Sequence, residues 1–141
     1  GKYDFIRLNF PNGDMVGHTG VYEAVICSME AMDLQLARLK KAVDAAGGIM
    51  LLTADHGNAD DMFEHDKKTG AVSMKKDGTA KAKTSHSLNP VPGIVYDPEF
   101  KGEYSKTLNE GLGISSWAAT CIELLGFVPP ADYDKSIINW N

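Results

Sequence analysis

The stretch that begins at Gly47 reads Gly47-Gly48-Ile49-Met50-Leu51-Leu52-Thr53-Ala54 and runs directly into Asp55-His56-Gly57-Asn58. Residues 49–54 are largely apolar and do not alternate with polar residues, which is typical of a strand covered on both faces. The two glycines before them favour the left-handed conformation that ends a helix. The stretch therefore predicts the end of a helix, a buried strand, and a polar loop at the strand's carboxyl end.

The residues before Gly47 have the pattern of an amphipathic helix. Apolar or small positions advance by threes and fours, and charged residues occupy the other faces. These apolar or small positions are Val21, Val25, Ser28, Met32, Leu36, Leu39, Val43 and Ala46. Thr19 is the expected N-cap. Residues 4–10, which end at a Pro-Asn-Gly turn signal, predict a strand upstream of the helix. Strand, helix and strand in this order predict two parallel strands with a right-handed crossover.

Further elements are expected on the C-terminal side. Residues 94–96 predict a third short strand, and Ser115 is expected to cap a last helix over residues 116–125 that ends at Gly126. Its apolar residues Trp117, Cys121, Ile122, Leu124 and Leu125 are expected to face the core. Residues 59–85 mix acidic residues with lysines and glycines, which predicts an exposed excursion. The fold class is therefore α/β.

Charge and composition exclude several classes of function. Lys+Arg 14 against Asp+Glu 19 gives the 141 residues a formal net charge of −5, so we expect no nucleic-acid or membrane partner. No apolar run approaches the roughly 20 residues of a membrane-spanning helix, and residues 1–4 do not resemble a signal peptide. Cys27 and Cys121 are too few for a disulfide framework, so free thiols in a cytoplasmic protein are expected.

Three polar clusters lie next to the predicted strands. They are Asn12-Gly13-Asp14-Met15-Val16-Gly17-His18, Asp55-His56-Gly57-Asn58 and Ser85-His86-Ser87-Leu88-Asn89-Pro90. In open α/β sheets, functional groups gather at the carboxyl ends of strands. The clusters offer the carboxylates and imidazoles of Asp14, His18, Asp55, His56 and His86. This ligand set suits Mn²⁺, Zn²⁺ or Fe²⁺ better than Ca²⁺, and it fits a two-metal site for phosphoryl transfer or hydrolysis.

Each of these residues also has an ordinary structural interpretation. Aspartate and histidine in loops are commonly caps or hydrogen-bond partners. Gly17, Gly20 and Gly57 suit either a close backbone approach or simple turn geometry. His65 is interpreted as a solvated loop histidine. Ser85 and Ser87 flank His86, but no nucleophile-elbow pattern surrounds them, so we assign no catalytic nucleophile to this chain.

At these clusters the sequence resembles the C-terminal part of cofactor-independent phosphoglycerate mutases, members of the alkaline phosphatase superfamily. The matching stretches are residues 9–20, 53–62 and 84–92, and residues 113–126 resemble that family's last helix. The resemblance implies a partial three-layer α/β/α, alkaline-phosphatase-like domain with a mostly parallel sheet. It also implies that residues 1–141 are a C-terminal fragment of the metal-binding phosphatase domain, with the excursion at about 59–85.

The resemblance further implies roles for the candidate ligands. Asp14, His18 and His86 match the protein ligands of one divalent ion, usually manganese, while Asp55 and His56 match half of the ligands of a second. The family interconverts 3-phosphoglycerate and 2-phosphoglycerate in glycolysis and gluconeogenesis through a phosphoserine, without a bisphosphoglycerate cofactor. The nucleophilic serine and the substrate-clamping domain would lie upstream, and no substrate-binding residue is assigned here.

Several expectations follow for the chain by itself. We expect it to supply metal ligands but to lack mutase activity alone, and to self-associate through apolar surface left by missing sheet neighbours. Gly13, Ser85 and Ser87 depart from the residues common in the family without removing a ligand. Two alternatives remain open: a fragment of another metalloenzyme of the superfamily, such as a phosphopentomutase or phosphodiesterase, and a non-catalytic metal-binding module.

Overall fold

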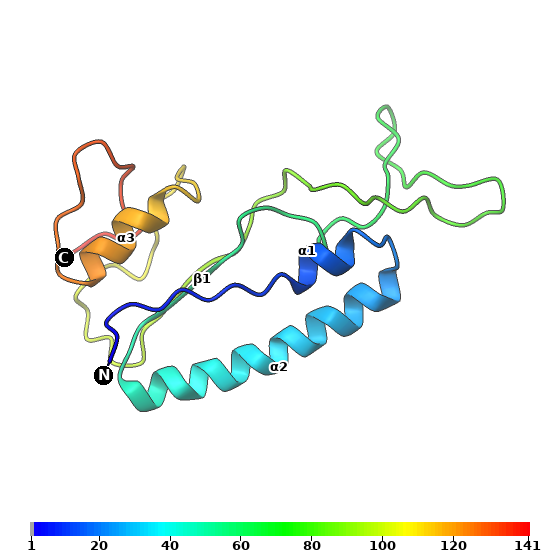
Figure 1. Ribbon diagram of the computed structural model, residues 1–141. Helices are drawn as coiled ribbons and strands as arrows, with labels where there is room; N and C mark the ends of the chain where they lie inside the picture. The colour runs from blue at the N-terminus through cyan, green and yellow to red at the C-terminus, as the bar shows by residue number, and fades with distance from the viewer. Residues whose placement is uncertain (1) are drawn as a thin grey trace. The chain divides into compact units, whose positions relative to one another are not determined.

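The computed structural model describes residues 2–141 (Figure 1). In chain order the elements are α1 (Asn12–Gly17), α2 (Tyr22–Ala46), β1 (Met50–Thr53), β2 (Gly93–Tyr96) and α3 (Ser116–Leu124). The chain divides into two compact units. Residues Leu8–Val95 form the first, called here the site unit. The second, called the terminal unit, combines residues up to Arg7 with Tyr96–Asn141.

The long helix α2 confirms the amphipathic pattern. It ends where the sequence predicts, because Gly47 adopts the left-handed conformation (φ 60°, ψ 34°) and its N–H bonds back to the last turn. Its start differs from the prediction. Val21 is the N-cap, whereas the Thr19 hydroxyl donates to the Val16 carbonyl (2.6 Å) and accepts from the Val21 N–H (3.2 Å). Thr19 therefore closes the turn between α1 and α2 and does not cap α2.

The short helix α1 stands where the sequence indicated only a turn. It starts after Pro11, whose carbonyl accepts the N–H of Met15 at 2.9 Å, and it packs against α2. Proline and glycine near its start read as turn signals, yet proline is well tolerated just before or at the first turn of a helix. The consequence is that Asp14 and His18 lie one helical turn apart.

The sheet of the site unit differs from the predicted one. β1 pairs with β2 in a small antiparallel sheet, and the antiparallel bridge between Gly57 and Ser87 lies beyond it. Residues 4–10 form no strand, so the predicted parallel pair and the mostly parallel sheet are not confirmed. An extended apolar segment becomes a strand only when a neighbour pairs with its backbone, and no such neighbour is present among residues 2–141.

The excursion at residues 59–85 belongs to the site unit and forms the extended loops drawn in green in Figure 1. Isolated antiparallel bridges join Phe63 to Ala82, His65 to Val72 and Met74 to Ala80. The base of the excursion is held by Asp61, which pairs with Lys83 at 2.5 Å and with His65 at 3.1 Å. His65 is therefore not simply solvated, because its other ring nitrogen lies 3.1 Å from the Gly70 carbonyl.

The terminal unit is built around α3, which ends before Gly126 (φ 83°) as predicted. Ser115 occupies the N-cap position but makes no side-chain cap. The buried face of the helix is also not the predicted apolar one: Ser116, Ala119 and Thr120 are buried, whereas the expected core residues are half-buried or exposed. Thr120 is fully buried because its hydroxyl bonds the returning C-terminal segment. None of the described helices could span a membrane.

Candidate metal centre

The first two candidate ligands are held by α1. Asp14 lies within the helix and His18 is its C-cap residue, with the His18 N–H bonded to the Asp14 carbonyl at 3.0 Å. Residues four apart on a helix lie on one face, so the two side chains meet. His18 Nε2 is 3.1 Å from Asp14 Oδ1. A single helical turn thus presents a carboxylate and an imidazole side by side.

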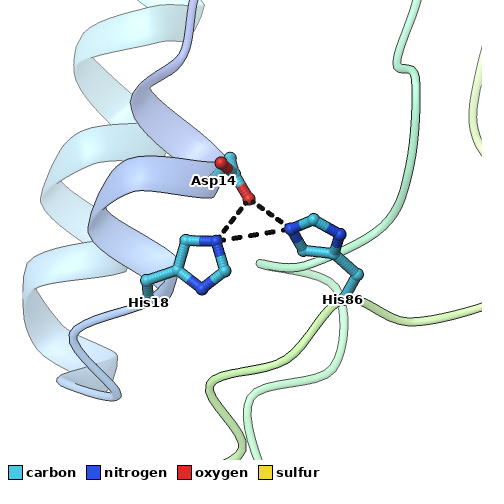
Figure 2. A group of neighbouring side chains, drawn as sticks. All are labelled: Asp14, His18 and His86. Atoms are coloured by element: carbon cyan, nitrogen blue, oxygen red, sulfur yellow. Dashed lines mark hydrogen bonds and ion pairs between the residues drawn. The ribbon is translucent and has the colours of Figure 1, made fainter.

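The third ligand comes from the loop before β2. His86 Nε2 lies 3.1 Å from the same Asp14 Oδ1 and 3.3 Å from His18 Nε2 (Figure 2). One ligand atom from each of Asp14, His18 and His86 falls within 4.8 Å of the others. The three side chains are 32% to 48% exposed. Residues 68 positions apart in the sequence therefore converge on one accessible point.

Asp55 and His56 are placed differently from each other. The His56 ring stacks on His86, with centroids 3.7 Å apart and planes 14° apart, and its Nε2 lies 3.9 Å from Asp14 Oδ1. Asp55 Oδ1 is 3.8 Å from the same His56 nitrogen, but its side chain is 88% exposed. His56 thus borders the Asp14–His18–His86 cluster, while Asp55 stands outside it.

The charge of Asp14 is stabilised by its surroundings. Partial desolvation acts to raise the pKa of this carboxyl group, but a hydrogen bond from Asn58 and the three neighbouring imidazoles outweigh it. The pKa of Asp14 is held below its usual value of 3.8. The carboxylate is therefore ionised at neutral pH, which is the form that binds a cation.

Two supporting contacts fix the ligands. Asn58 Nδ2 donates to Asp14 Oδ1 at 3.0 Å, and the Asn58 side chain is buried. His18 Nδ1 lies 2.6 Å from the Thr84 carbonyl oxygen. Because a carbonyl only accepts, Nδ1 donates to Thr84, and Nε2 is the ring nitrogen that faces Asp14 and His86. Such hydrogen bonds on the second ring nitrogen are what orient metal-binding histidines.

Sequence reasoning missed the supporting role of Asn58, although one signal pointed to it. A Cβ atom on Gly17 would collide with the Asn58 side chain. Gly17 is therefore glycine because Asn58 must pass close to α1 to reach Asp14. The sequence leaves two interpretations of Gly17 and Gly57 open, close backbone approach and turn geometry. Neither residue has a positive φ, and a Cβ atom on either would collide with a neighbouring side chain, so close approach applies to both.

The comparison with protein families agrees with this donor set. A family model described as the Metalloenzyme superfamily matches residues 1–129. The chain belongs to this superfamily. Membership of the Metalloenzyme superfamily and the clustered Asp14, His18 and His86 together support the use of a divalent metal.

Curated relatives of this chain carry the name phosphoglycerate mutase. The protein of Trypanosoma brucei brucei named 2,3-bisphosphoglycerate-independent phosphoglycerate mutase is 49% identical over 98% of this chain and 25% of its own length. A protein of Arabidopsis thaliana named a probable 2,3-bisphosphoglycerate-independent phosphoglycerate mutase 2 is 44% identical over 98% of this chain and 25% of its own length. The chain thus spans about a quarter of the length of the curated relatives it matches.

A solved structure gives the same result. The phosphoglycerate mutase of Leishmania mexicana, determined at low cobalt concentration, superposes with a TM-score of 0.87 at 44% identity. The match covers 94% of this chain and 24% of the other. The resemblance of this metalloenzyme chain to cofactor-independent phosphoglycerate mutases is confirmed, and the chain shares the fold of the corresponding part of that enzyme.

Proposed function

We propose that this chain forms part of a 2,3-bisphosphoglycerate-independent phosphoglycerate mutase and supplies protein ligands to its divalent metal ions. The observation that carries the proposal is the convergence of Asp14, His18 and His86 on one accessible point. The names of relatives that are 41–49% identical support the reaction. The substrate is then a small molecule, 3-phosphoglycerate or 2-phosphoglycerate, and the phosphoryl group is exchanged between its hydroxyls through a phosphoserine.

The candidate ligands divide between two ions in this proposal. Asp14, His18 and His86 hold one ion, and Asp55 with His56 supplies half of the ligands of the second. Imidazole with carboxylate suits Mn²⁺, which we propose as the metal, along with other borderline divalent ions. The exposed position of Asp55 fits a ligand whose partners come from another part of a longer protein.

Each residue has a defined task in such a site. A bound divalent ion would supply positive charge that stabilises phosphoryl oxygens and lowers the pKa of a hydroxyl nucleophile. The lowered pKa of Asp14 keeps it ionised, and the contact of His18 Nδ1 with Thr84 leaves Nε2 free to bind. Because no nucleophile is assigned within residues 1–141, we propose that this chain, as a fragment of the phosphatase domain, has no mutase activity alone.

Metal binding to the 141-residue chain gives a direct test. We expect Mn²⁺ to bind in calorimetric titration, and binding to fall sharply in Asp14→Ala, His18→Ala and His86→Ala. His65→Ala is the matched control, because His65 also pairs with an aspartate but lies at the base of the excursion. Occupancy should fall as the solution is acidified, since ligating histidines must be neutral. Binding that the three substitutions leave unchanged would contradict the ligand assignment.

The reaction needs a separate test in a longer protein. The matching quarter of the Trypanosoma brucei brucei mutase can be replaced by residues 1–141 of this chain. We expect the chimera to convert 3-phosphoglycerate to 2-phosphoglycerate with Mn²⁺, and the Asp14→Ala and His86→Ala chimeras to be inactive. A folded chimera that binds Mn²⁺ without mutase activity would point to another metalloenzyme reaction or to a metal-binding module.

Self-association and cytoplasmic location complete the proposal. Tyr3, Phe5, Ile6 and Leu8 are each more than half exposed, which supports association of the isolated chain through apolar surface. We expect its apparent mass in light scattering to rise with concentration. Cys27 and Cys121 are both free thiols, which supports a reducing compartment such as the cytoplasm.

A further inference from the structure

His86 is held in the cluster without a hydrogen bond to its second ring nitrogen. His18 has such a partner in the Thr84 carbonyl at 2.6 Å. For His86, the contacts within residues 2–141 are with Asp14, with His18 and with the stacked ring of His56, and none engages Nδ1. The backbone segment that carries His86 therefore contributes to its orientation, together with the ring's contacts to Asp14, His18 and His56.

That segment is tied down by Asp60. The Asp60 Oδ2 atom accepts a hydrogen bond from Ser87 Oγ at 2.7 Å and another from Asn89 Nδ2 at 2.7 Å. Ser87 directly follows His86, and Asn89 is two residues further on. One carboxylate thus holds both polar side chains of the turn that leaves His86.

The same junction is closed by the backbone around Gly57. The Ser87 N–H donates to the Gly57 carbonyl at 2.9 Å, and Ser87 is buried. A Cβ atom on residue 57 would collide with Ser87 Oγ and would come within 2.6 Å of Asp60 Oδ1. Glycine at position 57 therefore leaves the room that the Ser87 hydroxyl needs for its contact with Asp60.

Asp60 carries its charge at neutral pH. Burial acts to raise the pKa of this carboxyl group, but the hydrogen bonds from Ser87 and Asn89 outweigh it and lower the pKa below its usual 3.8. Hydrogen bonds to an ionised acceptor are about twice as strong as those between neutral groups. The two contacts are thus suited to fixing a loop.

We propose that Asp60 is a positioning residue of the metal centre: it fixes the Ser87–Asn89 turn and thereby holds the His86 imidazole against Asp14. The proposal deepens the proposed function and rests on it, since it assigns to Asp60 the orientation of one metal ligand. Within residues 2–141, the side-chain partners of Asp60 are Ser87 and Asn89 and not the cluster residues. Asp60 therefore acts through the segment that carries His86.

The first test needs no metal. In nuclear magnetic resonance spectra of the metal-free 141-residue chain, the His86 ring should show Overhauser contacts to the rings of His18 and His56, which lie 5.1 Å and 3.7 Å away. Asp60→Ala should abolish these contacts. Asp60→Asn, which keeps an acceptor oxygen, should preserve them in part. Asp66→Ala is the control, because Asp66 also accepts hydrogen bonds, but its three donors belong to Lys68 and Thr69 inside the excursion.

The second test uses Co²⁺ alone, whose visible absorption bands report the ligands around the ion. Asp60→Ala should weaken Co²⁺ binding about tenfold, as loss of a supporting partner does, and its spectrum at saturation should match that of His86→Ala. Asp60→Asn should recover most of the affinity, and Asp66→Ala should bind like the unsubstituted chain.

The outcomes separate the two proposals. Retained ring contacts together with unchanged Co²⁺ affinity in Asp60→Ala would overturn the positioning role while leaving the metal centre intact. Equal losses in Asp60→Ala and Asp66→Ala would also overturn it, because they would reflect general destabilisation. If the unsubstituted chain binds no Co²⁺, or if His86→Ala binds it equally well, the metal centre fails, whereas the ring contacts still decide whether Asp60 positions His86.

Discussion

The Asp14–His18–His86 cluster of the site unit and the Thr120 network of the terminal unit are both polar, but they differ in solvent exposure and in how their polar atoms are paired. Thr120 is fully buried, and its hydroxyl donates to the Ser116 carbonyl at 2.8 Å while accepting from Ser136 Oγ and from the Ile137 N–H. In the cluster, two imidazole nitrogens crowd one carboxylate oxygen at 3.1 Å each, and the side chains remain open to solvent.

The difference distinguishes structural polar groups from binding groups. A buried polar group must find its partners within the chain, because leaving it unpaired costs free energy. In the exposed cluster, Asn58 bonds Asp14 and Thr84 bonds His18, but one ligand atom each of Asp14, His18 and His86 also converges on a shared accessible point, where a bound cation would contact all three. The Thr120 network therefore stabilises the terminal unit, whereas we propose that the cluster binds a cation.

The largest effect that separates the two regions is expected at Asp14. Asp14→Ala removes the carboxylate that both imidazoles face, so the affinity of the chain for Mn²⁺ should fall more than about 100-fold, beyond the loss caused by a supporting residue. The midpoint of thermal unfolding without metal should fall only modestly, since Asp14 is partly exposed and the cost is limited to the buried Asn58 amide, which loses its acceptor. Calorimetry and circular dichroism measure the two quantities. A large loss of stability with intact metal affinity would reverse the roles of the two regions.

The converse effect is expected at Thr120. Thr120→Val keeps the shape of the side chain but leaves the Ile137 N–H and Ser136 Oγ without an acceptor, which should cost about 1–3 kcal/mol of unfolding free energy. Urea unfolding measures it. Ser115→Ala is the control, because Ser115 makes no cap hydrogen bond and should change stability by less than about 0.5 kcal/mol. Equal losses of unfolding free energy at the two positions would show that the Thr120 hydrogen bonds do not stabilise the terminal unit.

A smaller effect is expected at Gly17. Replacing glycine by alanine inside a helix normally stabilises it by about 1 kcal/mol. In Gly17→Ala, however, the added Cβ would displace Asn58 from Asp14, so affinity for Mn²⁺ should fall several-fold and the helix gain should be lost. Gly48→Ala serves as the control, because its nearest foreign atom would be 3.9 Å away. A Gly17→Ala chain with full metal affinity would make Asn58 dispensable.

The smallest effect concerns Asp61, a carboxylate paired like Asp14 but with its partners inside the excursion. The hydrogen bond from Lys83 holds the pKa of Asp61 below 3.8, with a further contribution from His65. A carboxyl group with a lowered folded-state pKa adds stability above the unfolded-state pKa and loses it as the pH falls through the folded-state value. The protection of amides in residues 62–83, measured as the exchange rate relative to the intrinsic rate at the same pH, should therefore decrease below about pH 4. Asp61→Asn should flatten this acid dependence, and an unchanged profile would contradict it.

The sequence predicted the long helix α2, the last helix α3 and the strands at Met50–Thr53 and Gly93–Tyr96, but not the short helix α1 or the antiparallel pairing of the strands. The span of α2, its stop at Gly47 and the end of α3 before Gly126 follow from side-chain periodicity and from the conformational freedom of glycine. Residues 4–10 failed as a strand because a strand depends on a neighbour that lies elsewhere in the chain. The predicted buried face of α3 was wrong because Thr120, whose hydroxyl accepts the Ile137 N–H, is buried in place of the larger apolar side chains.

The candidate site shows the same division. The sequence supplied the ligand types, since Asp14, His18 and His86 stand in polar clusters beside apolar runs. It could not supply Asn58 and Asp60 as supporting residues, because their partners lie 44 and 27 or more positions away. Gly17 and Gly57 were the sequence features connected with those contacts. They could be interpreted only once the structure showed which side chains pack against them.

The sequence by itself determined which residue types could serve as metal ligands and where α2 and α3 end, because donor chemistry, helix periodicity and glycine stop signals are properties of residues a few positions apart. Only the tertiary structure decided that the loop of His86 returns to α1, that one imidazole nitrogen of His18 is committed to Thr84, and that His56 stacks beside the cluster. These are contacts between distant segments, and their free energy depends on packing and on backbone pairing that no local pattern encodes.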